Sequence, residues 1–216
     1  MNHWIKKIFV LGLSTAFFSG LPGAEAAPEV PENIFKWIQS TSRADYYFNK
    51  EQICFAVDAE GYIDLNRLIV PTLKVYDSVQ IEDVVSKRRW RMQDMTGYDS
   101  LVGAADYLEF NLSGKTVKVT EHDDLDEEWS TLASETNYEA VSMDSYGEKD
   151  VDGKFYRAIL KYAADHQEDI IGHTKGKLRE EDKTRLEEAK NPPKDDKKDK
   201  KDNDKKDKKD KKDKRK

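Results

Sequence analysis

Cysteine is almost absent from this chain, which has a single one, Cys54, among its 216 residues. One thiol excludes any disulfide within the chain, so the fold must be held together by packing. Residues 53–57 alternate in the manner of a strand that is covered on both faces. The pattern therefore predicts that Cys54 is buried and serves as a small apolar side chain.

Long apolar runs are equally scarce. The one that exists covers residues 8–21 and follows two lysines. Ala24-Glu25-Ala26 then gives the small-x-small pattern that signal peptidase reads. The sequence therefore predicts a signal peptide over residues 1–26, cleavage before Ala27, and an exported protein of the periplasm, cell surface or extracellular space. No later segment approaches the length of a membrane helix, so no transmembrane segment is expected after processing.

Signatures of common catalytic machinery are missing as well. The chain has no glycine-rich phosphate loop, no nucleophile elbow and no Cys-His motif around Cys54. Paired carboxylates are abundant, but an acidic composition produces them without any site. The sequence favours a protein without catalytic activity, and no cofactor is expected.

The charge of the chain is unevenly placed. Residues 194–216 hold fourteen Lys or Arg and eight Asp and no apolar residue, which predicts disorder. The whole chain carries −6, so the body between signal peptide and tail carries −13. The tail would either tether the protein to anionic polymers or serve only as a solubilising extension. Export and the interspersed Asp residues argue against nucleic acid.

These composition shifts predict a single folded domain. We expect an N-terminal linker over 27–33, one globular α+β domain over 34–175, a charged helix or linker over 176–193, and the disordered tail over 194–216. The globular part has the usual size of one domain.

Period-two alternation dominates the first half of that domain and indicates strands. They are predicted at 34–40, 45–48, 52–57, 62–70, 73–76 and 80–92. Pro71 separates two of them, which favours an edge strand or a bend. The clearest hairpin has Leu108 and Phe110 on one strand and Val117 and Val119 returning on the same face. The pattern predicts a mostly antiparallel sheet with one buried and one wet face.

After residue 150 the apolar period becomes that of a helix. The stripe consists of Phe155, Ile159, Tyr162, His166 and Ile170. We expect this C-terminal helix to lie across the sheet and close the core. The core would contain Trp37, Phe110, Val117 and Phe155.

The N-terminal strands carry a resemblance to a known family. Trp37 with Ser40-Thr41, followed by Tyr46-Tyr47-Phe48-Asn49, is similar to surface-adhesin protein E, a family of small exported β-rich proteins. Asn49 stands where that family has an Asp, and its paired cysteines are missing. The resemblance covers only these strands and implies a surface interaction protein without catalysis.

One basic cluster suggests an anion-binding site. Lys87, Arg89 and Arg91 would share a face of the predicted strand, about 7 Å apart. Such a row of cations could hold an acidic glycan or a phosphate-bearing polymer. The alternative is a solvated strand face that pairs with the protein's own acids.

The densest acidic stretch, residues 121–128, suggests a metal site. His122, Asp123, Asp124 and Asp126 are its candidate ligands, because crowded carboxylates in a loop can bind calcium. The order of an EF-hand is absent, so the alternative is a solvated loop that leads into a short helix.

A second metal candidate lies on the predicted C-terminal helix. His166, Asp169 and His173 share one stripe that could hold zinc, but the H-E-x-x-H spacing is missing. A packed histidine with a hydrogen-bonded ring is the favoured interpretation.

Together these features predict a non-catalytic, exported interaction protein of the bacterial cell envelope, adhesin-like or another binding module. Its expected partners are anionic envelope polymers or a surface ligand, and no nucleic acid. The alternatives are an envelope hydrolase or metal-dependent enzyme that uses the acidic loop 121–128, and a periplasmic helper that holds unfolded proteins.

Overall fold

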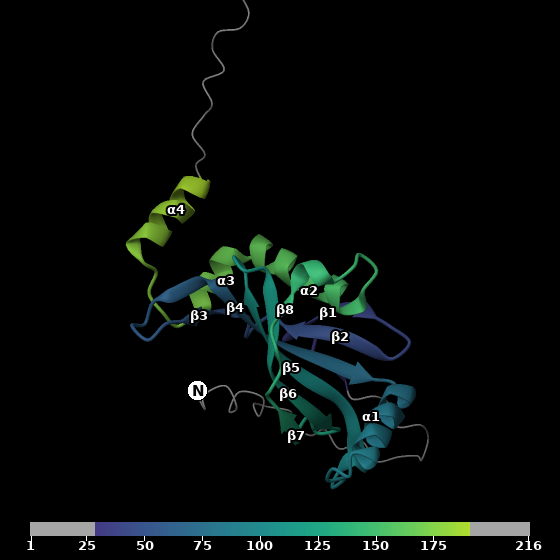
Figure 1. Ribbon diagram of the computed structural model, residues 1–216. Coiled ribbons are helices and arrows are strands. Elements are labelled where there is room, and N and C mark those ends of the chain that lie inside the picture. The colour runs from purple at the N-terminus through teal and green to yellow at the C-terminus, as the bar shows by residue number, and fades with distance from the viewer. Residues whose placement is uncertain (1–28, 191–216) are drawn as a thin grey trace, which may run out of the picture. The chain divides into compact units, whose positions relative to one another are not determined.

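The computed structural model describes residues 29–190 of the chain (Figure 1). The predicted signal peptide and the predicted tail lie outside the described residues. The strands in the described part are β1 (Phe35–Ser40), β2 (Ala44–Asn49), β3 (Cys54–Val57), β4 (Ile63–Tyr76), β5 (Leu101–Asn111), β6 (Thr116–Asp126), β7 (Thr131–Glu135) and β8 (Val141–Ser142). The helices are α1 (Ser78–Trp90), α2 (Val151–Asp165), α3 (Gln167–His173) and α4 (Glu180–Lys190). All strand pairs are antiparallel, which confirms the α+β class.

The strands form one sheet with the order β1-β2-β4-β5-β6-β7, while β3 pairs with β4 and β8 pairs with β6. The two strands predicted on either side of Pro71 are a single strand, so the predicted break is wrong. Pro71 pairs with Tyr107 of β5 inside β4. On the other side of β4 the partner changes at this point, because β3 pairs as far as Ile69 and β2 only from Thr72. A residue without an N–H is tolerated at such a gap in the ladder.

Strands β5 and β6 form the predicted hairpin, with the predicted apolar residues on one face. Phe110 pairs with Val117, and Leu108 pairs with Val119. A nearby glycine lets β4 and β5 approach closely: a Cβ on Gly103 would lie 2.2 Å from the carbonyl oxygen of Lys74. Only glycine fits at that distance, so Gly103 helps to set the position of β4 around Lys74.

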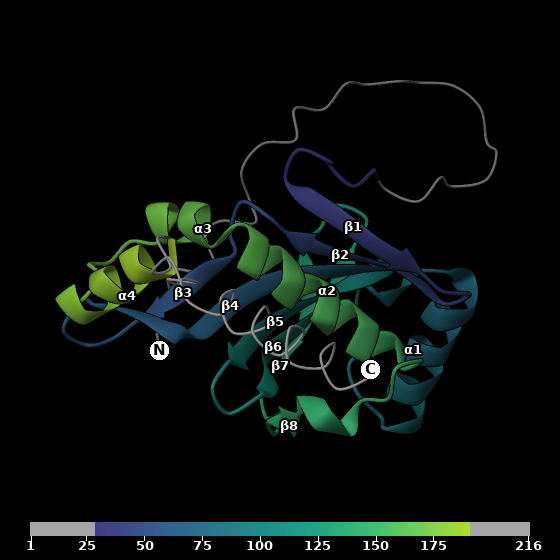
Figure 2. The same ribbon diagram turned by 90° about the horizontal axis from the view of Figure 1, so that it is seen from above.

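Helix α2 lies across one face of the sheet (Figure 2). Phe155 meets Tyr46 edge-on with ring centroids 5.3 Å apart, and Tyr162 meets Phe48 in the same way at 4.9 Å. Such pairs add to the apolar area that the helix buries. The single helix predicted for this region is interrupted at His166, where φ is −122° and ψ is 25°. Helix α3 begins directly after this bend.

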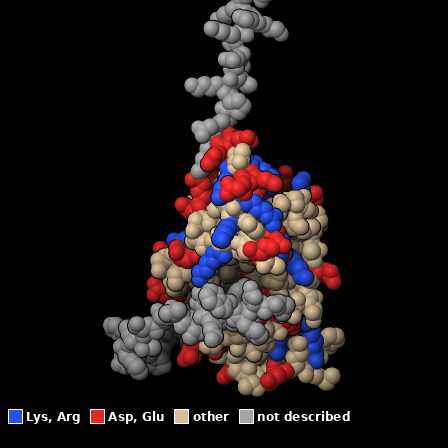
Figure 3. Space-filling view, turned by 90° about the vertical axis from the view of Figure 1, so that its left-hand side faces the viewer, with Lys and Arg blue, Asp and Glu red and all other residues tan. Residues whose placement is uncertain are grey.

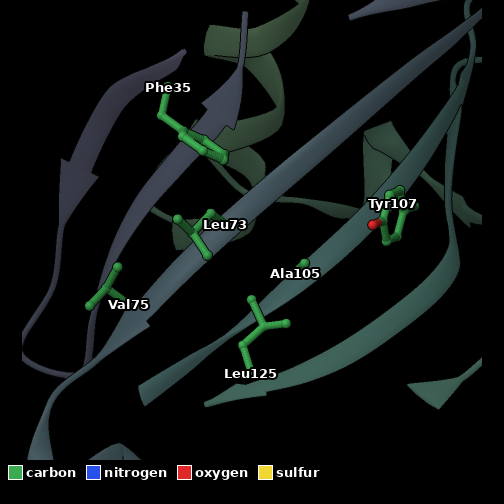
Figure 4. Packing of buried hydrophobic residues seen from close by; sticks show 6 residues of the cluster. All are labelled: Phe35, Leu73, Val75, Ala105, Tyr107 and Leu125. Atoms are coloured by element: carbon green, nitrogen blue, oxygen red, sulfur yellow. The ribbon is translucent and has the colours of Figure 1, made fainter. Parts of the chain in front are cut away.

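The opposite face of the sheet is also buried in its middle, so the prediction of one wet face is wrong there. Six residues form this cluster (Figure 4): Phe35, Leu73, Val75, Ala105, Tyr107 and Leu125. Of the predicted core residues, Phe110, Val117 and Phe155 are buried as expected. Trp37 is 55% exposed, because it lies on the edge strand β1. Cys54 is half-buried, and burial raises the pKa of its thiol.

Helix α1 replaces the strand predicted for residues 80–92, and that prediction is wrong. Asp77 caps the helix by accepting a hydrogen bond from the Gln80 N–H at 2.7 Å. Ile81, Val84 and Val85 recur at helical spacing and are half-buried, so they form the inner side of α1. The β-branched and aromatic residues that suggested a strand are thus compatible with a helix as well. Figures 1 and 2 place α1 at the end of the sheet away from β3 and α3.

The chain divides into two compact units, the first ending at Lys177 and the second beginning at Leu178. The second unit contains α4, in which Lys183 pairs with Glu180 at 2.6 Å. None of the helices in residues 29–190 is long and apolar enough to cross a membrane.

Candidate functional site

The acidic stretch that was predicted as a loop is part of strand β6, and the loop prediction is wrong for residues 121–126. Because side chains alternate along a strand, His122 and Asp124 lie on one face of the sheet and Asp123 on the other. The Asp123 carboxylate accepts a hydrogen bond from the Ser134 hydroxyl of β7. Asp126 accepts the N–H groups of Glu128 and Ser130 and so shapes the turn into β7.

This division separates the four candidate metal ligands. His122 and Asp124 are within hydrogen-bond distance of each other, but Asp123 and Asp126 make their own local contacts. The residues that the structure describes contain no group of three or more His, Cys, Asp or Glu side chains placed to hold a metal ion. The predicted metal site is therefore not assembled in this part of the chain.

The face of the sheet that carries His122 instead holds a network of paired charges. His122 Nδ1 lies 2.6 Å from Asp106 Oδ1, and its Nε2 lies 3.3 Å from Asp124 Oδ1. Burial disfavours the imidazolium, but hydrogen bonds to Asp106 and Asp124 outweigh it and raise the pKa of His122 to about 10. Both ring nitrogens therefore carry protons and donate to carboxylates at neutral pH.

Lys74 of β4 is the second cation of the network. Its Nζ lies 3.0 Å from Asp106 Oδ2 and 3.9 Å from Asp152 at the start of α2. Burial disfavours its charge, but the attraction of Asp106 and Asp152 raises the pKa of Lys74 above the ordinary value. Burial likewise opposes ionisation of Asp106, while Lys74 and His122 together hold its pKa below the ordinary value.

Arg88 is the third cation, and it connects α1 to the sheet. Its Nη1 lies 3.7 Å from Asp124 Oδ2, and its guanidinium carbon lies 4.1 Å from the centroid of the Tyr98 ring. The Tyr98 hydroxyl donates to the same Asp124 oxygen at 2.6 Å. Arg88 also donates to the backbone oxygen of Asp94 at 2.9 Å. The inner side of α1 is thereby fixed to β6 and to the loop that follows the helix.

The network has the chemistry of a structural element. Three cations face three carboxylates, and each of these groups has a partner of opposite charge. A general base must be unprotonated at working pH, and His122 is not. Balanced and hydrogen-bonded charges of this kind hold elements in register, here β4, β5, β6, α1 and α2.

The two histidines of the second metal candidate also make local contacts within the protein. His166 Nδ1 lies 2.9 Å from the Tyr162 carbonyl oxygen, and the ring stacks on Tyr162 with centroids 4.0 Å apart. His173 Nε2 lies 2.6 Å from the Ile53 carbonyl oxygen, while Asp169 is exposed. The favoured interpretation of packed, hydrogen-bonded histidines agrees with these contacts.

The three candidate anion-binding residues lie at the C-terminal end of α1, where the helix does not place Lys87 and Arg89 on one face, so the predicted shared strand face is wrong. Lys87, Arg89 and Arg91 are exposed, unlike Arg88 between them, which turns inward. Lys87 pairs with Asp83 at 2.9 Å. Arg89 and Arg91 have no carboxylate within ion-pair distance among the described residues. We call Lys87, Arg89, Trp90, Arg91 and Met92 the α1 tip.

The α1 tip also presents apolar side chains. Trp90 is 84% exposed and Met92 is 92% exposed, the largest values among the exposed large hydrophobic residues of the described chain. On the face shown in Figure 3, cationic and anionic side chains are interspersed. The combination of unpaired cations with exposed apolar groups distinguishes the tip as a candidate binding surface.

Sequence reasoning missed the partners of His122. Asp106 lies in the apolar segment Leu101–Asn111, and a carboxylate there signals a buried counter-ion. The identity of that counter-ion depends on the register of β4 with β5, which the sequence does not reveal.

Comparison of the chain with protein-family models, with curated proteins and with solved structures gave no match. The resemblance to surface-adhesin protein E therefore stays a prediction.

Proposed function

We propose that the protein is a non-catalytic, exported binding protein of the cell envelope, and that the α1 tip is its contact surface for phosphate- or carboxylate-bearing partners. The observation that carries this proposal is a combination: Arg89 and Arg91, two exposed cations without a carboxylate partner among the described residues, flank or adjoin the highly exposed Trp90 and Met92. In an acidic body with many available carboxylates, cations left unpaired are free to bind anions from outside.

The contacts that fix α1 to the sheet support a binding role for the α1 tip. Arg88 is drawn inward by Asp124, Tyr98 and the Asp94 backbone. Neighbouring side chains on a helix point in different directions, so anchoring Arg88 turns Lys87 and Arg89 outward. The buried charges therefore orient the exposed ones, and the two sets of charged residues have separate roles.

The proposal includes several features that rest on the sequence. These are export through residues 1–26, the family resemblance of the first strands, and a disordered tail that adds positive charge at 194–216. It also includes α2 as the helix that closes the core. A tail and a tip of the same sign would act together on an anionic surface.

The test compares binding of the mature chain, residues 27–216, to isolated cell envelopes by co-sedimentation between about 0.01 and 1 M salt. The variant Arg89→Gln/Arg91→Gln removes two charges from the tip. The control Lys154→Gln/Lys161→Gln removes two exposed charges from α2 instead. We expect the tip variant to bind roughly 2- to 30-fold more weakly at low salt, and the control to bind like the unaltered protein.

Equal losses in both variants would mean that only net charge matters and that the tip is no site. No loss in either would overturn the proposal. At high salt the tip variant and the unaltered protein should bind alike, because screening removes the contribution of exposed charges.

A further inference from the structure

The backbone of the α1 tip is hydrogen-bonded, so the exposure of its side chains is not the result of a frayed helix end. The N–H groups of Arg91, Met92 and Gln93 donate to carbonyl oxygens of the last turn of α1 at 3.0, 3.0 and 3.1 Å. Met92 has a φ of 54°, in the left-handed region that side-chain-bearing residues rarely adopt. Arg88 closes the loop from inside through the Asp94 carbonyl oxygen. The hydrogen-bonded backbone thus fixes the positions from which the exposed Trp90 and Met92 side chains project.

The side chains of the α1 tip indicate which class of anionic partner it binds. Tryptophan is enriched at the interface between lipid headgroups and acyl chains, and methionine is apolar enough to enter the same layer. Arg and Lys can place their charged ends among lipid phosphates while their aliphatic stems lie against apolar material. A glycan could stack on Trp90 and pair with the cations, but it would leave Met92 in water. A bilayer interface offers anionic phosphates to the cations and apolar material to both Trp90 and Met92.

We infer that the α1 tip docks on an anionic lipid bilayer, with Trp90 and Met92 inserted at the headgroup level and Lys87, Arg89 and Arg91 on the lipid phosphates. This inference rests on the proposed function and names the source of the anionic groups. It describes a peripheral contact, since a few side chains enter the interface and no helix crosses it.

The acidic body sets the conditions for docking. Glu82 and Asp83 on the same helix, and Asp94 and Asp99 after it, are the carboxylates closest in sequence to the tip. Asp83 is already paired with Lys87. At physiological salt, charges more than about 8 Å apart are largely screened. A bilayer that contacts the α1 tip is therefore attracted by the tip and only weakly repelled by the rest of the acidic body. Each cation near an anionic leaflet strengthens binding by about fivefold at low salt.

The experiment uses the mature chain and vesicles of phosphatidylcholine alone or with phosphatidylglycerol, with acyl chains brominated near the headgroup to quench inserted tryptophan. We expect binding and quenching with the anionic vesicles and little with the zwitterionic ones. Trp90→Phe should abolish the quenching, while Trp37→Phe, which alters another exposed tryptophan, should preserve it. Met92→Gln should weaken vesicle binding about threefold to tenfold, by the loss of one apolar side chain from the interface.

A parallel measurement with soluble polyphosphate separates the two proposals. Binding to polyphosphate and to anionic vesicles without quenching would keep the tip as an anion-binding site and overturn bilayer insertion. Quenching that persists in Trp90→Phe would place the contact elsewhere and overturn the inference as well. Absence of binding to both probes would overturn bilayer docking and remove phosphate-bearing partners from the proposed function.

Discussion

The buried charge network makes a prediction about stability that can be worked out from His122. Its folded pKa is about 10 and its ordinary value is 6.5, because Asp106 and Asp124 hold the ring protonated despite burial. At 1.36 kcal/mol per pKa unit this difference corresponds to about 5 kcal/mol. The side chain is 25% exposed, so water screens part of the interaction, and roughly 3–5 kcal/mol is expected.

Proton linkage determines the direction in which the stability changes with pH. The folded state keeps its proton up to about pH 10, whereas the unfolded state loses it near the ordinary pKa of 6.5. The contribution of His122 is therefore complete below pH 6.5 and is lost as the pH rises towards 10. Within this window stability should fall by about 1.4 kcal/mol per pH unit from this group.

The assay measures the free energy of unfolding in urea for the unaltered protein and for His122→Gln between pH 6 and 10. Glutamine keeps a hydrogen-bonding side chain but does not titrate. The difference between the two proteins should be roughly 3–5 kcal/mol at the acidic end and should shrink as the pH rises. Two curves that remain parallel across this range would refute the protonated His122 and the network built on it.

Three further predictions concern packing and processing. Gly103→Ala should lower the free energy of unfolding by roughly 1–3 kcal/mol, because the added Cβ would meet the Lys74 carbonyl oxygen. The control Gly147→Ala should be nearly neutral, because a Cβ there has nothing within 4 Å. Equal effects of the two variants in urea unfolding would contradict the close approach of β4 and β5. Phe155→Ala should lower the free energy of unfolding by roughly 3–5 kcal/mol, because Phe155 is buried. Val151→Ala, at an exposed position of α2, should lower it far less. An unchanged melting temperature for Phe155→Ala would show that α2 does not close the core. The intact mass of the exported protein should correspond to a chain that begins at Ala27, and retention of residues 1–26 would contradict cleavage there.

Features that depend on neighbouring residues could be predicted from the sequence. The register of Phe110 with Val117 follows from a short turn and alternating apolar residues, both of which are local. The same holds for Phe155 and Ile159, whose spacing marks the buried stripe of α2. Local patterns fix a hairpin or a helix face because their partners are close along the chain.

Helix α1 shows where a local pattern was misinterpreted. The β-branched residues Ile81, Val84 and Val85 and the aromatic Trp90 suggested a strand over residues 80–92. The Asp77 cap and the pairing of Asp83 with Lys87 four residues later are helix signals in the same segment. These signals favour a helix, and in a helix Arg88 can point inward while Lys87, Arg89 and Arg91 stay exposed.

The charge network required information that one sequence does not contain. His122 is placed against Asp106 by the register of β5 with β6, and Asp106 reaches Lys74 only because β4 lies alongside. An acidic run such as 121–126 most often marks a solvated loop. Here it is a strand in which Asp124 pairs with His122 and with Arg88 of α1, and His122 also pairs with Asp106 of β5, so the cost of burying these charges is offset.

The central claim is that the protein contacts the envelope through the α1 tip, and crosslinking in cells tests it most directly. A photoreactive phenylalanine analogue is placed at position 90 or, as a control, at position 37, the site of another exposed tryptophan. After irradiation, the account predicts adducts with envelope material from position 90 and far fewer from position 37. Equal yields from both positions, or adducts from position 37 alone, would contradict the claim.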